Sequence, residues 1–175
     1  MTTNRQSNLE AIEIYAAIKQ VMKEANSHHC QSWWLNSKNF DLKSMKAPLA
    51  GEIIRDFTMD DLVYYESIGE WRVHKGVDIK PKDTLLIESA FAGTVESVNT
   101  SELTGTEIVI DHGNNIKTLY SNLVSSSVKI GDKVEQGQAI GNVGKTVSIE
   151  ASDGAHLHFE LFVDGKNVNP MDYIN

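Results

Sequence analysis

The sequence predicts a mainly β, antiparallel domain of the sandwich or single-sheet type, preceded by an N-terminal α-helical segment. From about residue 47 onward, short runs rich in β-branched and aromatic residues alternate with Gly, Asn and Asp. No helical pattern interrupts these runs, which argues against the crossover helices of a parallel sheet. Residues 9–25 instead repeat their apolar side chains at helical spacing. We therefore expect a helix and linker in residues 1–45 and a β domain in residues 46–175.

The expected helix runs from Leu9 to Ala25. Asn8 suits its N-cap, and Glu10 and Glu13 place negative charge in the first turn, where the helix dipole favours it. A single amphipathic helix of this length is marginally stable by itself. It is therefore expected to dock on the β domain, on a partner or on a second copy of the chain.

Seven runs in the second region are expected to form strands. They are Glu52–Phe57, Thr84–Ile87, Gly93–Val98, Glu107–Asp111, Lys117–Tyr120, Ala139–Val143 and His156–Val163. Turn residues separate several of them, as at Gly113-Asn114-Asn115. Asp164-Gly165 predicts the clearest hairpin, because apolar residues flank it on both sides.

Composition and charge narrow the functional classes. The chain has 175 residues, of which 41% are hydrophobic and 23% charged, which is typical of a globular domain with a real core. Its formal net charge of -8 argues against sequence-independent binding to nucleic acid and against electrostatic docking onto anionic lipid. The sequence shows neither a signal peptide nor an apolar run of membrane-spanning length, so we expect any membrane attachment to come from an anchor outside this chain.

Histidines and an aspartate make up a candidate metal site. His156 and His158 lie two residues apart in a predicted strand, so their side chains should project from the same face. Gly76 permits a close turn between His74 and Asp78. Imidazole nitrogens and a carboxylate oxygen form a typical ligand set for zinc. Taken alone, each pair is more often a packing or hydrogen-bonding feature, and only the combination favours a metal.

The neighbours of these residues resemble the LytM, or lysostaphin-type, metallopeptidases. The resemblance is carried by His74-Lys75-Gly76-Val77-Asp78-Ile79, by Ile108–Asn114 with Lys117–Tyr120, by Val128–Val134 with Gly137–Gly141, and by His156–Glu160. It implies that one zinc ion is held by His74, Asp78 and His158, with water in the remaining position. It also implies that His156 is a catalytic histidine beside the metal and that His112-Gly113 is a structural turn.

The chain departs from the active members of that family at two places. Asn122 stands where they carry a second catalytic histidine, and an amide cannot accept and return a proton near neutral pH. Losing a general acid–base group typically lowers the rate by ~10²–10⁴. The segment Lys145–Ala155 is also longer than the turn that usually precedes the His-x-His pair, which predicts altered access to the cleft.

With these two departures, the sequence resembles the stage II sporulation protein Q branch of the family. It is most similar to the clostridial form of that branch, which keeps the histidine found here as His74. This resemblance implies a zinc-binding domain with little or no hydrolysis, exposed outside the cytoplasm on the forespore membrane. Its implied partner is the stage III sporulation protein AH of the mother cell, bound across the intermembrane space as part of a channel formed during engulfment, with peptidoglycan as a further candidate ligand. Two alternatives stay open. One is an active zinc-dependent peptidoglycan endopeptidase, and the other is a regulatory domain that activates a separate cell-wall hydrolase.

Overall fold

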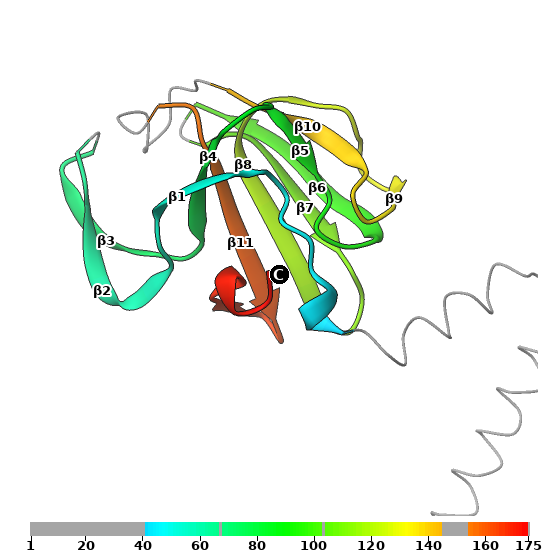
Figure 1. The fold of residues 1–175 in the computed structure, drawn as a ribbon, viewed down its shortest axis with the longest axis horizontal. Coiled ribbons are helices and arrows are strands. Elements are labelled where there is room, and N and C mark those ends of the chain that lie inside the picture. Colours follow the sequence, from blue (N-terminus) through cyan, green and yellow to red (C-terminus); the bar gives the residue numbers. More distant parts are fainter. Residues whose placement is uncertain (1–40, 67, 103, 145–153, 175) are drawn as a thin grey trace, which may run out of the picture. The chain divides into compact units, whose positions relative to one another are not determined.

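A computed structural model describes residues 41–66, 68–102, 104–144 and 154–174 of the chain (Figure 1). Residues 41–175 cluster as one compact unit. The helix expected over Leu9–Ala25 and most of the segment Lys145–Ala155 lie outside the described residues. Within the described ranges, no helix combines the length and the apolar character that a membrane crossing needs.

The described residues are built mainly of strands that pair antiparallel, which confirms the predicted fold class. The strands are β1 (Gly51–Arg55), β2 (Thr58–Tyr65), β3 (Glu70–His74), β4 (Val77–Pro81), β5 (Leu86–Glu88), β6 (Gly93–Ser101), β7 (Gly105–Asp111), β8 (Ile116–Ser126), β9 (Lys133–Val134), β10 (Ala139–Val143), β11 (Leu157–Val163) and β12 (Lys166–Val168). Two short 3-10 helices, η1 (Leu42–Ser44) and η3 (Pro170–Asp172), flank them. A bridge between Met45 and Ile174 ties the two ends of this unit together.

One large sheet runs in the order β1-β4-β11-β8-β7-β6-β9, while β2 and β3 pair only with each other. Strand β10 pairs with both β8 and β5, and β12 pairs with β11. Figure 1 shows the β2–β3 hairpin projecting to one side of the large sheet. Strand β11 is therefore central, because it pairs with β4 on one edge and β8 on the other.

Two tight turns form where the sequence predicts them. In the β7–β8 hairpin, Asn114 and Asn115 have φ angles of 51° and 60°. In the β11–β12 hairpin, Asp164 and Gly165 have φ angles of 51° and 74°. Positive φ at both central residues defines a type I′ turn, whose twist matches that of the flanking strands. These turns therefore fix the register of β8 and β12 against their neighbours.

The strands missed by the sequence analysis are β2, β3 and β4, in and next to the β2–β3 hairpin, and the two-residue strand β9. Residues 58–65 contain Asp60-Asp61, which interrupts the alternation of apolar residues that predicts a strand, and most side chains of β2 are exposed. The run predicted over Glu52–Phe57 ends as a strand at Arg55, because the chain leaves the large sheet there to enter the hairpin. The last predicted run begins at Leu157, so His156 precedes strand β11.

The core lies against β11, β8 and β7. Ile108 and Ile110 of β7 and Leu157, Phe159 and Leu161 of β11 alternate with more exposed neighbours, and all five are 0% exposed. Successive side chains of a strand point to opposite faces, so this alternation places one face of each strand in the core. The packing of these buried side chains in the core thereby fixes the position of β11.

Tyr120 is the largest fully buried side chain, and its hydroxyl is part of a buried polar cluster. The hydroxyl accepts a hydrogen bond from the backbone N–H of Ala90 at 2.8 Å and lies 3.0 Å from the Thr118 hydroxyl. Burial raises the pKa of Tyr120, although hydrogen bonding opposes the shift, so the phenol stays neutral. Its ring lies 5.2 Å from that of Phe159, centroid to centroid.

Replacing Tyr120 by phenylalanine is expected to lower the free energy of unfolding by about 1–3 kcal/mol, because the Ala90 N–H then stays buried without its acceptor. Urea denaturation of the wild type and the variant measures this difference. Tyr64→Phe serves as the control, since Tyr64 is 45% exposed and its hydroxyl should contribute little. Equal losses in the two variants would contradict the importance assigned to the buried hydrogen bond.

Candidate metal centre

The first two candidate ligands are placed by the β3–β4 connection. His74 is the last residue of β3 and Asp78 the second residue of β4, and both are buried. Between them, Gly76 passes so close to β11 that an added Cβ would lie 2.3 Å from the carbonyl oxygen of Phe159. Only glycine fits at such a distance. Gly76 thus lets the connection pack directly against the strand that carries the third candidate ligand.

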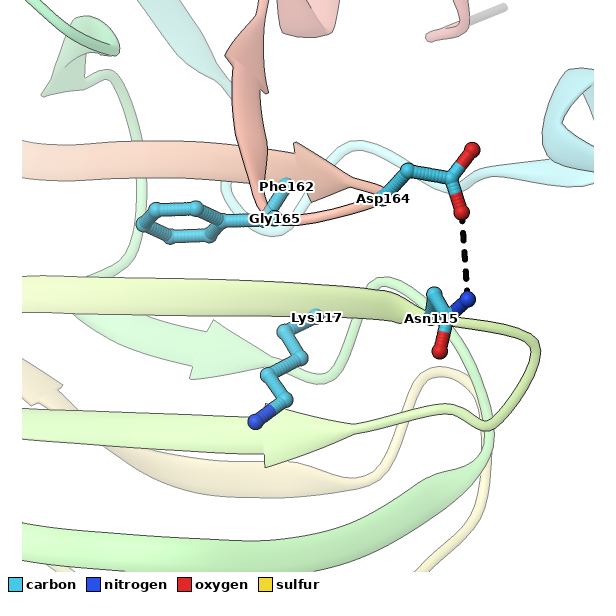
Figure 2. A pocket seen from close by; sticks show the side chains of 5 residues that line it. All are labelled: Asn115, Lys117, Phe162, Asp164 and Gly165. Atoms are coloured by element: carbon cyan, nitrogen blue, oxygen red, sulfur yellow. Dashed lines mark hydrogen bonds between the residues drawn. The ribbon is translucent and has the colours of Figure 1, made fainter.

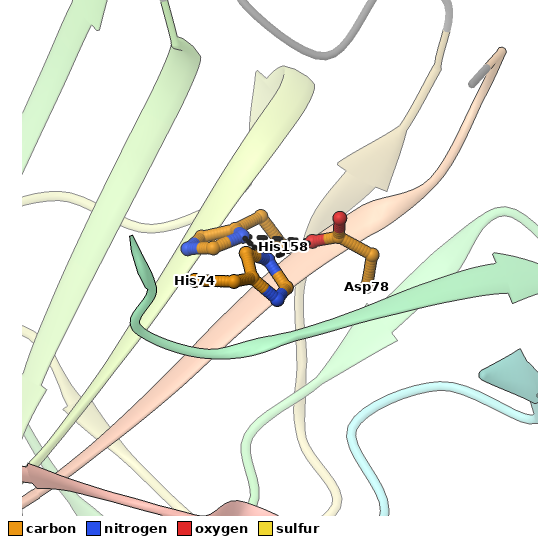
Figure 3. A group of neighbouring side chains, drawn as sticks. All are labelled: His74, Asp78 and His158. Atoms are coloured by element: carbon orange, nitrogen blue, oxygen red, sulfur yellow. Dashed lines mark hydrogen bonds and ion pairs between the residues drawn. The ribbon is translucent and has the colours of Figure 1, made fainter. Parts of the chain in front are cut away.

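The third candidate ligand, His158, lies directly opposite Asp78 in the pairing of β11 with β4. Figure 3 shows the side chains of His74, Asp78 and His158 converging on one point. His74 Nε2 lies 3.1 Å from Asp78 Oδ1 and 3.2 Å from His158 Nδ1, and the last two atoms are 2.7 Å apart. The structure therefore brings the three sequence-predicted ligands together.

The outer nitrogens of both histidines have acceptors. His74 Nδ1 lies 2.7 Å from the carbonyl oxygen of Asp56, and His158 Nε2 lies 3.1 Å from Glu160 Oε1. Since a carbonyl and a carboxylate can only accept, each outer nitrogen donates its proton. The inner nitrogens of the neutral rings then present lone pairs to each other and to the Asp78 carboxylate. Three acceptors that face one another are stabilised by a cation between them, which can be a metal ion or, without one, a proton on a ring nitrogen that is shared with the carboxylate.

The spacing of these three atoms suits zinc. Zinc bonds to nitrogen and oxygen of roughly 2.0–2.1 Å in a tetrahedron place neighbouring ligand atoms about 3.3 Å apart. The observed separations are between 2.7 and 3.2 Å, so small movements of the side chains would complete the geometry. Among the described residues, this is the group of His, Cys, Asp and Glu side chains whose ligand atoms converge in this way.

The Asp78 carboxylate is buried and charged. Burial by itself raises the pKa of Asp78, but hydrogen bonding to His158 and His74 outweighs burial and brings the pKa far below its usual range. On its other side, Arg55 Nη1 lies 3.6 Å from Asp78 Oδ2, and the guanidinium stacks 4.8 Å from the centre of the Tyr65 ring. Asp78 is therefore a carboxylate whenever a metal could bind.

Asn122 and His156 form a separate pair beside the metal centre. Asn122 Nδ2 lies 2.7 Å from His156 Nε2, and His156 Nδ1 lies 3.0 Å from the carbonyl oxygen of Gly154. The amide N–H donates to Nε2, so Nδ1 carries the proton of the neutral imidazole. Asn122 also has a φ of 64°, a left-handed conformation that asparagine adopts more readily than most residues. Asn122 thus holds His156 through an amide that cannot exchange a proton with it near neutral pH.

A cleft opens beside this pair, with a volume of about 530 Å³. The β2–β3 hairpin supplies one wall, with Leu62, Tyr65, Arg72 and Val73. The rest of the lining is more polar and consists of Lys75, Thr104, Glu107, Ser121, Asn122, His158 and Glu160. A molecule in the cleft would therefore reach His158, which is one candidate metal ligand, and Asn122.

A second pocket, of about 510 Å³, shares no residue with this cleft (Figure 2). Its lining consists of Asn115, Lys117, Phe162, Asp164 and Gly165 around the two tight turns. Lys117 forms an ion pair with Glu96 at 2.7 Å, which raises the pKa of the lysine, and Asn115 donates to Asp164. These polar groups already satisfy one another, so we assign no chemistry to this pocket.

His112 lies outside the group of three. Its Nδ1 lies 3.0 Å from the carbonyl oxygen of Ala92, and its Nε2 lies 2.7 Å from the Thr118 hydroxyl. The following Gly113 has a φ of 77° and accepts from Ile116 to close the β7–β8 turn. These contacts support the structural role expected for His112 and Gly113.

Burial lowers the pKa of His112 below its ordinary value of 6.5, although the Ala92 carbonyl opposes the shift. His112 is therefore protonated at a higher pH in the unfolded chain than in the folded chain. As the pH falls below about 6.5, this linkage destabilises the fold until the pH passes the folded-state pKa. Urea denaturation between pH 7.5 and 5 should show the wild type losing stability relative to His112→Gln. A difference between the two proteins that does not change with pH would contradict this expectation.

Comparisons with known proteins agree with this geometry. The stage II sporulation protein Q of Bacillus subtilis is 34% identical over 107 residues, which cover 60% of this chain and 38% of that protein. A chain in the structure of the SpoIIQ–SpoIIIAH pore-forming complex superposes with a TM-score of 0.67 at 26% identity, over 77% of this chain and 93% of that one. A zinc-containing peptidase from Vibrio cholerae superposes with a TM-score of 0.64 at 28% identity, over 73% of this chain and 39% of that one.

The family assignment rests on the region that contains the metal centre. The sequence pattern of peptidase family M23 matches residues 72–170, more than half of the chain. That range begins just before His74 and includes Asp78, Asn122, His156 and His158. The strands, the convergent side chains and the sequence pattern all lead to one assignment, and the chain belongs to peptidase family M23.

Proposed function

We propose that this chain is a zinc-binding domain of a sporulation protein that binds a partner protein and has little or no peptidase activity. The observation that carries the proposal is the pair formed by Asn122 and His156 beside a complete ligand set. A metal can be held by His74, Asp78 and His158, whereas Asn122 stands where the active members of the family carry a second catalytic histidine. The similarity to the stage II sporulation protein Q supports a role in sporulation.

The proposed metal is one zinc ion with a structural role. His74, Asp78 and His158 come from β3, β4 and β11, so one ion would join the projecting hairpin to the centre of the large sheet. When bound, zinc would also polarise a carbonyl group and lower the pKa of a water molecule at its open position. Because the site exists only in the folded chain, binding would stabilise the fold.

The proposed partner is the stage III sporulation protein AH. A relative with the same fold is seen in a pore-forming complex with that protein, at an identity of 26% to this chain. We place the domain outside the cytoplasm, facing the intermembrane space, as part of a protein of the forespore membrane. The contact with the partner should use an exposed sheet edge or hairpin, since adding a strand to an edge is a common way to join β domains.

An active peptidoglycan endopeptidase is the second candidate, and the cleft lined by His158 and Asn122 favours it. Both candidates can be tested with one preparation of the wild-type chain. Its affinity for the stage III sporulation protein AH is measured by calorimetry, and its release of soluble fragments from purified peptidoglycan is followed in the presence of zinc. Partner binding without fragment release supports the proposal. Fragment release that a chelator abolishes, with no partner binding, would reverse the order of the two candidates.

A further inference from the structure

We propose that Glu160 and Asn167 are positioning residues that set the zinc affinity of the centre, by holding His158 with Nδ1 toward the metal and Nε2–H toward Glu160. This inference rests on the zinc binding proposed above. Neither residue belongs to the ligand set of His74, Asp78 and His158, and neither can reach the point on which those side chains converge without giving up its present hydrogen bonds.

Glu160 is placed by the alternation of β11. It follows His158 by two residues, so both side chains project from the same face of the strand. Glu160 Oε1 lies 3.1 Å from His158 Nε2, and both side chains are only 13% exposed. A charged carboxylate can only accept, so it requires the proton to be on Nε2.

Asn167 in turn holds Glu160. Its Nδ2 donates to Glu160 Oε2 at 2.6 Å and to the carbonyl oxygen of Lys75 at 3.3 Å. Lys75 lies in the connection between His74 and Asp78, so one amide group from β12 links the carboxylate behind the third ligand to the backbone between the first two. The tight turn at Asp164-Gly165 sets the register that brings Asn167 opposite Phe162 of β11.

The consequence for metal binding follows from the two tautomers of imidazole. A neutral His158 without an acceptor at Nε2 would divide between the Nδ1–H and Nε2–H forms, and only the second presents a lone pair to the metal. The ring could also rotate toward the cleft, which His158 and Glu160 both line. Outer hydrogen bonds of this kind typically change metal affinity by roughly 10–100-fold.

The test measures zinc dissociation constants for the full chain by competition with a chelator of known affinity. Glu160→Ala is expected to raise the dissociation constant by about 10–100-fold. Glu160→Gln keeps an acceptor for Nε2–H and should recover part of that loss, and Asn167→Ala should show a smaller rise. The matched controls are Glu107→Ala, a carboxylate that lines the same cleft, and Asn142→Ala, an amide of β10 that donates to Ser125 of β8. Both controls should bind zinc like the wild type.

A second readout separates positioning from a general loss of stability. In the zinc-loaded protein labelled with nitrogen-15, the Nε2–H proton of His158 should give a signal protected from exchange with water. That signal should broaden or vanish in Glu160→Ala and persist in Glu160→Gln and in Glu107→Ala. Equal zinc affinity in the wild type and Glu160→Ala, with the signal unchanged, would overturn this inference alone. A wild-type chain that binds no zinc would overturn the proposed metal centre together with it.

Discussion

Bound zinc is expected to fall from one ion per chain to none when His74 is replaced by alanine. His74 Nε2 lies within 3.2 Å of both other ligand atoms, and the side chain is fully buried, so no neighbouring group can move in without leaving a cavity. Asp78 and His158 alone would leave the ion with two protein ligands, fewer than the three that a zinc site with an open position normally has. Metal analysis after gel filtration measures the stoichiometry directly.

The same substitution should remove the stabilisation that zinc provides. A ligand at a free concentration 1,000 times its dissociation constant stabilises the native state by about 4 kcal/mol. Thermal unfolding of the wild type should therefore shift upward when zinc is added, and His74→Ala should not respond. His112→Gln is the matched control, because His112 is half-buried and hydrogen-bonded but lies apart from the group of three. One zinc ion retained by His74→Ala would show that this histidine is not a ligand.

Replacing Asn122 by histidine is expected to raise the rate of peptidoglycan cleavage by roughly 10²–10⁴, the usual contribution of a general acid–base group. The backbone at residue 122 has a φ of 64°, and histidine is among the residues that tolerate the left-handed region. The new imidazole would lie beside His156, in a cleft that already reaches the ligand His158. The release of soluble fragments from purified peptidoglycan, with zinc present, measures the gain.

Two further variants isolate the origin of any gain. Asn122→Ala also removes the hydrogen bond to His156 but supplies no acid or base, so its rate should stay at the level of the wild type. Combining Asn122→His with His74→Ala should return the rate to background, because the metal is lost. If the wild type already cleaves as fast as Asn122→His, the second histidine is not limiting, and the chain is an active endopeptidase in its natural form.

Much of the large sheet can be predicted from the sequence because its signals are local. Alternating apolar residues in Glu107–Asp111 and in β11 show which face of each strand is buried. Asn114-Asn115 and Asp164-Gly165 are residue pairs that type I′ turns favour. The β2–β3 hairpin gives no comparable signal, because it buries little of either face and carries Asp60-Asp61 in its first strand.

The three convergent candidate ligands were also predicted, because the short motifs that contain them resemble those of a known metallopeptidase family. His74 and Asp78 are separated by one tight connection, and His158 is on a strand of strong alternation. The groups around them depend on pairings between distant segments. The backbone carbonyl of Asp56 accepts a hydrogen bond from His74, and the identity of residue 56 gives no indication of this role. Asn167 reaches Glu160 only because of the register in which β12 pairs with β11.

The sequence by itself thus determined the fold class and most strands of the large sheet, because periodicity encodes them, and its resemblance to a metallopeptidase family indicated the residues able to hold a metal. Only the tertiary structure decided that His74 and His158 present Nε2 and Nδ1 to one point, that Asn122 holds His156, and that Arg55 and Glu160 lie behind the ligands. These arrangements arise where β1, β4, β8 and β11 meet, and the chemistry of a site depends on distances between strands that no local pattern specifies.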